Sequence, residues 1–241
     1  MHVAAAFLLL FVCSFGGISP VHAATKSYGL TSFDSIDVQG PYQVSITLGQ
    51  RINARAEGAQ TALDKVEMEV VSNRLVIRER RDGAAQVRRD GAGPVRIFVN
   101  ASKALNMISI SGAGSVAVSG LSGTTLKLSL TGSGQIAATV AKADKIELLV
   151  DGSGSVSLTG VARALSSGTS GSGTIDAAAL GVRQLVLRQS GAGNGRYNVS
   201  EFATITASGT GNVSISGKGL CRIKQDGGTN IQCAGKILPA K

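Results

Sequence analysis

Histidine is almost missing from this sequence, and its absence limits the chemistry that the chain can perform. The two histidines, His2 and His22, both lie within the first 23 residues. Serine–histidine–aspartate and cysteine–histidine catalytic sites need an imidazole as the general base. Zinc sites of the usual kind likewise need histidine or several cysteines as ligands. We therefore expect a chain that is not an enzyme, with no catalytic residues, no metal site and no cofactor.

Aromatic side chains are also scarce. Tryptophan is absent, aromatic residues make up 4% of the chain, and Tyr197 and Phe202 are the only ones beyond residue 100. Proteins that bind single-stranded nucleic acid stack its bases on aromatic rings interleaved with cations. A nucleic-acid partner is therefore not expected, and a glycan site would have to use hydroxyl, amide and arginine groups.

Long apolar runs are absent except at the N-terminus. Residues 3–15 are nearly all apolar, and Val21 and Ala23 then stand at the two positions that a signal peptidase recognises. This pattern predicts a signal peptide over residues 1–23, cleaved between Ala23 and Ala24, and export to the periplasm or the bacterial cell surface. The mature chain that remains has no stretch of the roughly 20 apolar residues that would span a membrane.

Two alternatives to a cleaved signal remain open. The first is an uncleaved membrane anchor, which the short apolar run and the helix-breaking Gly16, Gly17 and Pro20 disfavour. The second is a lipoprotein anchored through Cys13, which Val12 disfavours because a small residue is needed at that position.

Cysteine is used sparingly. The chain has three, and removal of the signal leaves Cys221 and Cys233. An even number of cysteines in an oxidising compartment predicts a disulfide between them. The alternative is a pair of buried free thiols. A bridge over so short a loop is worth about 3 kcal/mol.

What the chain does contain is a repeated glycine motif. Each copy has Ser, Thr or Asp followed by Gly-x-Gly, and successive copies begin at a nearly constant interval of about 20 residues. The copies occupy residues 111–114, 131–134, 151–154, 170–173, 190–193 and 208–211, and residues 226–229 form a divergent seventh.

Apolar residues alternate with polar ones on both sides of these motifs, as in Leu126, Leu128 and Leu130 before one copy and Ile136 after it. This period of two indicates half-buried strands. One repeat in extended conformation spans roughly 66 Å, enough for one coil of short strands and corners. We therefore predict an all-β, single-domain β-solenoid with about 20 residues per repeat. The alternative, one antiparallel hairpin per repeat in a barrel or propeller, is disfavoured by the nearly constant period.

The N-terminal part has a different sequence pattern. Residues 33–38 and 44–48 are predicted as two strands separated by Gly40-Pro41, and residues 66–70 and 75–77 as two more around a turn at Ser72-Asn73. Residues 78–94 carry five arginines and two Asp-Gly pairs. We interpret them as an exposed loop, with a basic binding loop as the alternative.

Several of these segments resemble the head GIN domain of autotransporter adhesins. Residues 33–46 resemble the opening strands of that family, residues 73–77 its strand with a polar residue followed by Leu-x-Ile, and the Gly-x-Gly series its repeating core. The resemblance implies a right-handed β-helix-like fold and an adhesin-like protein in the periplasm or on the cell surface. It transfers no catalytic residues.

The resemblance also gives a domain organisation. The GIN-type β-helical domain is expected over residues 33–217. A short N-terminal segment over residues 24–32 precedes it, and a C-terminal capping segment with the disulfide follows over residues 218–241.

Positive charge is concentrated on the repeats. Residues 101–241 hold 13 of the 24 basic and 6 of the 15 acidic side chains, and the whole chain has a net charge of +9. Such a surface attracts anionic partners. We therefore expect an exported, non-catalytic envelope protein, adhesin-like or structural, that binds anionic envelope polymers or glycans. Arg183, Arg188 and Arg196 are the candidate anion-binding residues, and the alternative is that the cations only keep the β-surface soluble.

The enzymatic alternative is a β-helical polysaccharide lyase or hydrolase. Such reactions need paired carboxylates. The two best placed acids, Asp151 and Asp176, are separated by more than one repeat and would not align in successive coils.

Overall fold

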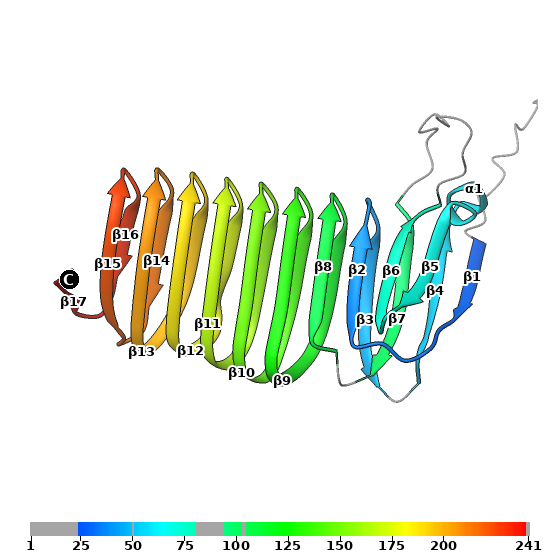
Figure 1. The fold of residues 1–241 in the computed structure, drawn as a ribbon, viewed down its shortest axis with the longest axis horizontal. Helices are drawn as coiled ribbons and strands as arrows, with labels where there is room; N and C mark the ends of the chain where they lie inside the picture. The colour runs from blue at the N-terminus through cyan, green and yellow to red at the C-terminus, as the bar shows by residue number, and fades with distance from the viewer. Residues whose placement is uncertain (1–23, 50, 81–93, 103–104, 240–241) are drawn as a thin grey trace, which may run out of the picture.

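The computed structural model describes residues 24–49, 51–80, 94–102 and 105–239, which form an elongated β-solenoid (Figure 1). All the strands belong to one hydrogen-bonded system, and the only described helix is the short α1 (Gln60–Leu63). No helix among the described residues is long and apolar enough to cross a membrane. The prediction of an all-β solenoid is confirmed.

Five long strands build the regular part of the solenoid. Each bends near its middle, so that its second half lies in the front sheet of Figure 1 and its first half in the rear sheet behind it. They are β9 (Ser115–Gly132), β10 (Gln135–Gly152), β11 (Ser155–Gly171), β12 (Thr174–Gly191) and β13 (Asn194–Gly209). Neighbouring coils pair in parallel along both halves. The antiparallel hairpin alternative is therefore wrong.

The glycine motif makes the sharp turn from the front sheet to the rear sheet. Each of its two glycines is required for a different reason. Gly132 adopts a φ of +110°, which a side chain disfavours. Gly134 has no such dihedral, but a Cβ there would lie 2.5 Å from the carbonyl oxygen of Gly114 in the previous coil. The amide of Gln135 donates to that same oxygen at 2.9 Å. The turns therefore stack backbone on backbone, with no room for side chains.

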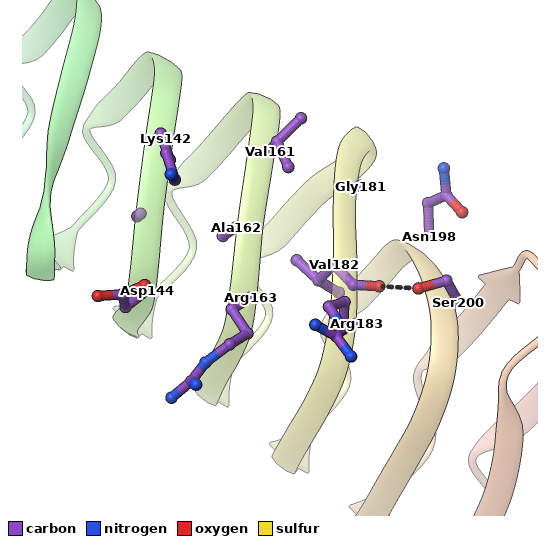
Figure 2. A pocket seen from close by; sticks show the side chains of 11 residues that line it. Lys142, Asp144, Val161, Ala162, Arg163, Gly181, Val182, Arg183, Asn198 and Ser200 are labelled. Atoms are coloured by element: carbon purple, nitrogen blue, oxygen red, sulfur yellow. Dashed lines mark hydrogen bonds between the residues drawn. The ribbon is translucent and has the colours of Figure 1, made fainter.

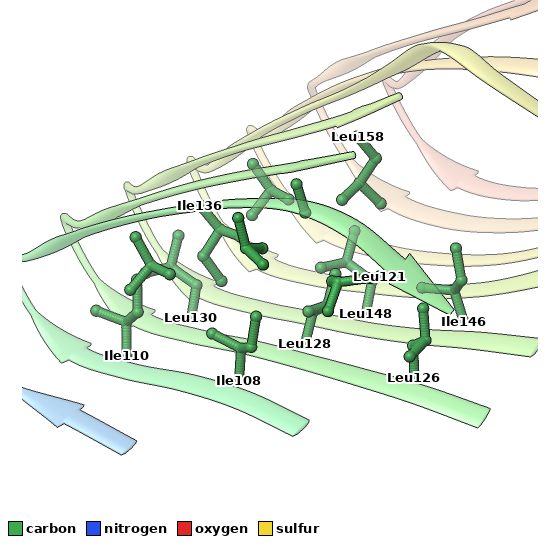
Figure 3. Close-up of a cluster of buried hydrophobic side chains, with 14 of the residues drawn as sticks. Ile108, Ile110, Leu121, Leu126, Leu128, Leu130, Ile136, Ile146, Leu148 and Leu158 are labelled. Carbon is green, nitrogen blue, oxygen red and sulfur yellow. The ribbon is translucent and has the colours of Figure 1, made fainter. Parts of the chain in front are cut away.

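The core consists of apolar columns that run along the solenoid axis (Figure 3). Ile108, Leu128 and Leu148 form one column, because the parallel register places each opposite the next. Their side chains are almost fully buried. Every second residue of a strand points inward, so the alternation in the sequence becomes a continuous core.

Polar residues interrupt these columns in the middle of the solenoid. Ser167 follows Leu148 in its column, and its hydroxyl lies 3.1 Å from the hydroxyl of the fully buried Tyr197. Burial raises the pKa of Tyr197, so its hydroxyl stays protonated and available for this bond. The ring of Tyr197 lies against Gly195, where a Cβ would approach its Cε2 to 2.6 Å. The large ring thus fills the space that Gly195 leaves.

The N-terminal coils stack out of sequence order. The first coil consists of β2 (Ser35–Gln39) and β3 (Gln43–Gly49), and the second of β6 (Arg74–Glu79) and β7 (Arg96–Ser102). β2 lies between β6 and β8 (Met107–Gly112), and β3 lies between β7 and β9. The chain therefore builds the second coil outside the first, then returns across it to continue the solenoid.

Two strands close this end in the antiparallel sense. β4 (Asn53–Gly58) pairs with β7, and β1 (Ala24–Gly29) pairs with β4. β5 (Val66–Val71) forms a hairpin with β6 through Ser72 and Asn73, which have φ values of +49° and +66°. The predicted strands over residues 33–77 are confirmed, whereas β1, β4 and β7 were not predicted. The predicted basic loop falls mostly on residues 81–93, outside the described residues.

The solenoid continues to the C-terminal end of the described chain. β14 (Asn212–Ser216), β15 (Leu220–Gly227), β16 (Asn230–Cys233) and β17 (Ile237–Leu238) keep the parallel stacking. The predicted capping segment thus contains further coil, and its divergent glycine motif still turns at Gly227, with a φ of +114°.

A disulfide links Cys221 in the front sheet to Cys233 in the rear sheet, with their Cα atoms 6.6 Å apart. The predicted pairing is confirmed. Cys221 stacks against Ala203 and Cys233 against Ile215, so the bridge crosses the core where the apolar columns end. It therefore stabilises the last described coil, of which the two-residue strand β17 covers only a part.

Candidate functional site

The edge opposite the glycine turns is irregular, and the irregularity opens a groove. Between β12 and β13, Ala177 lies opposite Tyr197 but Gly181 lies opposite Asn198, so β12 has three extra residues at this corner. The pairing of β10 with β11 also shifts, between Val140 and Ala143. The coils differ in length, and the difference is absorbed here because the glycine turns must stay in register.

The groove runs across four successive coils and encloses about 520 Å³ (Figure 2). Small and apolar groups, Ala162, Gly181 and Val182 among them, line part of it, and Val161 beside them is 59% exposed. The Ser200 hydroxyl donates to the carbonyl oxygen of Val182 at 3.3 Å, which joins β13 to β12 in the groove. The full lining is Lys142, Ala143, Asp144, Val161, Ala162, Arg163, Gly181, Val182, Arg183, Asn198 and Ser200.

Three cations and one acid line the groove. The register places Asp144, Arg163 and Arg183 in one row, one from each of three consecutive coils. Arg183 is already engaged, because its Nε donates to Oε1 of Glu201 at 2.6 Å. Lys142 and Arg163 form no ion pair with any described residue. These two side chains are therefore the cations of the groove that remain available to a ligand.

The three arginines predicted as anion-binding residues do not come together. Arg183 lines the groove, Arg188 points outward from the front sheet, and Arg196 points outward from the rear sheet. Arg196 is also paired, with its guanidinium 2.6 Å from Asp176. A common site of the three is excluded by this geometry.

Sequence reasoning missed Lys142 and Arg163. Arg163 follows Lys142 by slightly more than one repeat, and Arg183 follows Arg163 by one full repeat. Aligning the repeats on their glycine motifs would have placed all three near the same corner of successive coils. The prediction used the total charge of the repeats, which does not show where on the coil each cation lies.

The two acids of the enzymatic alternative lie on opposite sheets. Asp151 stands next to a glycine turn on the front sheet, between Thr131 and Ser170, whereas Asp176 lies on the rear sheet beside Arg196. They cannot act as a carboxylate pair on one substrate. Within the described part of the chain, no group of three or more His, Cys, Asp or Glu side chains could hold a metal ion.

The family described as "Putative auto-transporter adhesin, head GIN domain" matches residues 32–219, most of the chain. The chain belongs to this family. The resemblance noted from the sequence is thereby confirmed. Adhesin head domains act outside the cytoplasm, so membership indicates an envelope or extracellular protein. A comparison with curated proteins found no match.

Solved structures of similar fold include proteins from Bacteroides and Parabacteroides species. A putative adhesin from Bacteroides fragilis is 21% identical, with a TM-score of 0.77 over 90% of this chain and 97% of its own. A putative adhesin from Parabacteroides distasonis is 22% identical, with a TM-score of 0.66 over 88% and 98%. A protein described as a putative lipid binding protein from the same species is 17% identical, with a TM-score of 0.65 over 90% and 96%. At these identities the likeness establishes the fold.

Proposed function

We propose that this chain is an exported, non-catalytic envelope module of the GIN family that binds anionic envelope polymers or glycans in its edge groove. The observation that carries the proposal is the pair Lys142 and Arg163, two cations without ion-pair partners among the described residues, beside an apolar floor. A sugar ring or acyl group can lie on such a floor while its acidic group meets the cations.

The spacing of the coils supports a linear ligand. Neighbouring parallel strands lie about 4.8 Å apart, so the groove offers its side chains at regular steps along the solenoid axis. Arg163 and Arg183 come from adjacent coils, and Lys142 comes from the coil before them. A polymer with repeated acidic groups lying along the axis can contact several coils at once, which raises its affinity over that of a single sugar.

The groove is tested by neutralising its two available cations. A Lys142→Gln/Arg163→Gln variant should bind soluble polyuronate or lipopolysaccharide about 100-fold more weakly, since a hydrogen bond to a charged group contributes about 1.5 kcal/mol and each 1.4 kcal/mol is tenfold. Affinity and its salt dependence are measured by titration calorimetry. The slope against salt concentration should fall with the affinity, because fewer counter-ions are displaced.

A Lys127→Gln/Lys145→Gln variant is the matched control, because it removes the same charge from the front sheet. Both lysines contact Glu147, whose Oε1 lies 2.6 Å from Lys145 and whose Oε2 lies 3.9 Å from Lys127. The hydrogen bond from Lys145 holds the pKa of Glu147 below its usual range, so the carboxylate is ionised and partly neutralises the lysines. Equal weakening in both variants would show that only net charge matters, and would reject the groove.

The same titration should include an assay for released reducing ends or unsaturated sugars. Turnover of a bound polymer would favour the lyase or hydrolase alternative and reject a non-catalytic module. Asp151 and Asp176 lie on opposite sheets, so they do not support that alternative.

Export rests on cleavage of residues 1–23. Ala24, the predicted first residue of the mature chain, is the first residue of β1 and lies opposite Gly58. Cleavage after Ala23 keeps all the residues of β1 that the structure describes. Terminal sequencing of protein from the periplasm or cell surface should begin at Ala24. A chain that begins at a lipid-modified Cys13, or one with Met1 retained, would reject the predicted processing.

A further inference from the structure

A second surface of the solenoid combines cations with exposed apolar side chains. It lies on the front sheet near the C-terminal end, where β12, β13 and β15 present three outward positions each. The register aligns these positions as Gln184–Phe202–Leu220, Val186–Thr204–Arg222 and Arg188–Thr206–Lys224. None of the nine positions is acidic, whereas three are basic and three are apolar. We call the six residues Val186, Arg188, Phe202, Leu220, Arg222 and Lys224 the front-sheet patch.

The cations of this patch are not neutralised by acidic side chains among the described residues. Arg188, Arg222 and Lys224 form no ion pair with any residue that the structure describes. The guanidinium of Arg222 lies over the ring of Phe202, 5.3 Å from its centroid, and its buried Nε has no hydrogen-bond partner. The earlier coils of the same sheet differ, because there Glu147 pairs with Lys127 and Lys145.

Two of the three apolar members of the patch are exposed, and Phe202 is half-buried. Val186 and Leu220 each retain 40% of their accessible surface. An apolar side chain is not required at an outward position of this sheet, because the neighbouring outward positions are Thr204 and Thr206. Exposed apolar groups beside cations on a flat sheet favour binding to an anionic lipid surface. The cations meet the acidic headgroups, and the apolar groups reach the hydrocarbon beneath them. A hydrophilic polymer would gain little from them.

We infer that the front-sheet patch docks on an anionic phospholipid bilayer, with Arg188, Arg222 and Lys224 on the headgroup phosphates and Val186, Phe202 and Leu220 at the interface. This surface is separate from the edge groove and does not depend on the proposed function. A solenoid that lies on a membrane through this patch keeps its rear sheet turned toward the opposite side.

The test is co-sedimentation of the mature protein with phosphatidylcholine vesicles that contain or lack phosphatidylglycerol. The protein should bind only the anionic vesicles, and added salt should weaken binding. An Arg188→Gln/Lys224→Gln variant should bind about 25-fold more weakly, since each cation near such a surface contributes roughly fivefold. The matched control is Lys127→Gln/Lys145→Gln, with the same loss of charge on the same sheet, and it should bind within about twofold of the wild type.

Leu220→Ser distinguishes a lipid from a soluble polymer. It should weaken vesicle binding several-fold and leave polyuronate binding unchanged, because only the bilayer takes up the apolar side chain. The inference would be overturned if the Arg188→Gln/Lys224→Gln variant still bound anionic vesicles as the wild type does. It would also be overturned if this variant lost its binding to polyuronate but kept its binding to vesicles. Lys142→Gln/Arg163→Gln should retain vesicle binding, so failure of the groove and failure of the patch can be told apart.

Discussion

Replacing Gly152 by alanine is expected to lower the free energy of unfolding by about 4 kcal/mol. Gly152 has a φ of +116°, and a Cβ there would lie 2.5 Å from the carbonyl oxygen of Gly132 in the previous coil. The added methyl group therefore costs energy twice, once in backbone strain and once in a clash with rigid backbone. Because the turns stack along the whole solenoid, the clash cannot be relieved without opening the parallel pairing of β10 with β9.

Gly123→Ala is the matched control for this change. Gly123 also lies in a long strand, but its φ is ordinary, and a Cβ would meet only the Cδ2 of Leu126, at 3.6 Å. This variant should be as stable as the wild type, or more stable by up to about 1 kcal/mol, because alanine restricts the unfolded chain. Urea unfolding followed by circular dichroism measures both. A Gly152→Ala protein as stable as Gly123→Ala would show that the turns are not held by the stacking described here.

Loss of the disulfide is expected to remove about 3 kcal/mol, and the loss should be confined to the C-terminal coils. Cys221 and Cys233 are 12 residues apart and join the two sheets in the last coil of the described chain, which only the short β17 partly covers. Among the described strands, β16 pairs only with β14, and β17 only with β15. In a solenoid each coil contacts only its neighbours, so the end can open while the middle remains folded.

Hydrogen exchange measured by mass spectrometry tests this. In Cys221→Ala/Cys233→Ala, protection should fall over β15, β16 and β17 and stay unchanged over β9 to β12. Alanine is chosen because Cys221 is fully buried and a serine hydroxyl there would add its own cost. Wild-type protein treated with reductant should behave like the variant, and reductant should have no effect on the variant itself. Unchanged exchange at the C-terminal end would contradict a stabilising role for the bridge.

The candidate site was only partly visible in the sequence. The charge of the repeats indicated a basic solenoid, and one of the three predicted anion-binding residues, Arg183, lines the groove. Arg188 and Arg196 were grouped with it, although they lie on opposite sheets. Linear proximity misleads here, because each coil of the solenoid sends side chains only a few positions apart to opposite sides of the molecule. Lys142 and Arg163, which are farther apart in sequence, lie at the same edge.

The sequence by itself determined the coil, because the coil depends on local rules. Period-two alternation sets which side chains face inward. Gly-x-Gly marks the turns, where the φ of the first glycine and the close approach of the previous coil to the second both exclude a side chain. These rules recur in the six copies of the repeat that have the full Gly-x-Gly motif, so the all-β solenoid and its repeat length follow from the pattern. The disulfide followed as well, since Cys221 and Cys233 are the cysteines that remain after the predicted signal is removed.

Tertiary structure alone decided how the N-terminal strands are ordered and where the groove lies. β2 pairs with β6 on one side and β8 on the other, a choice among strands of similar apolar pattern that depends on which arrangement buries all of them. The groove arises where coils of unequal length stack in register at their glycine turns, so that the surplus residues of β12 are displaced to the opposite edge. Both are properties of the stack as a whole, and no single repeat contains them.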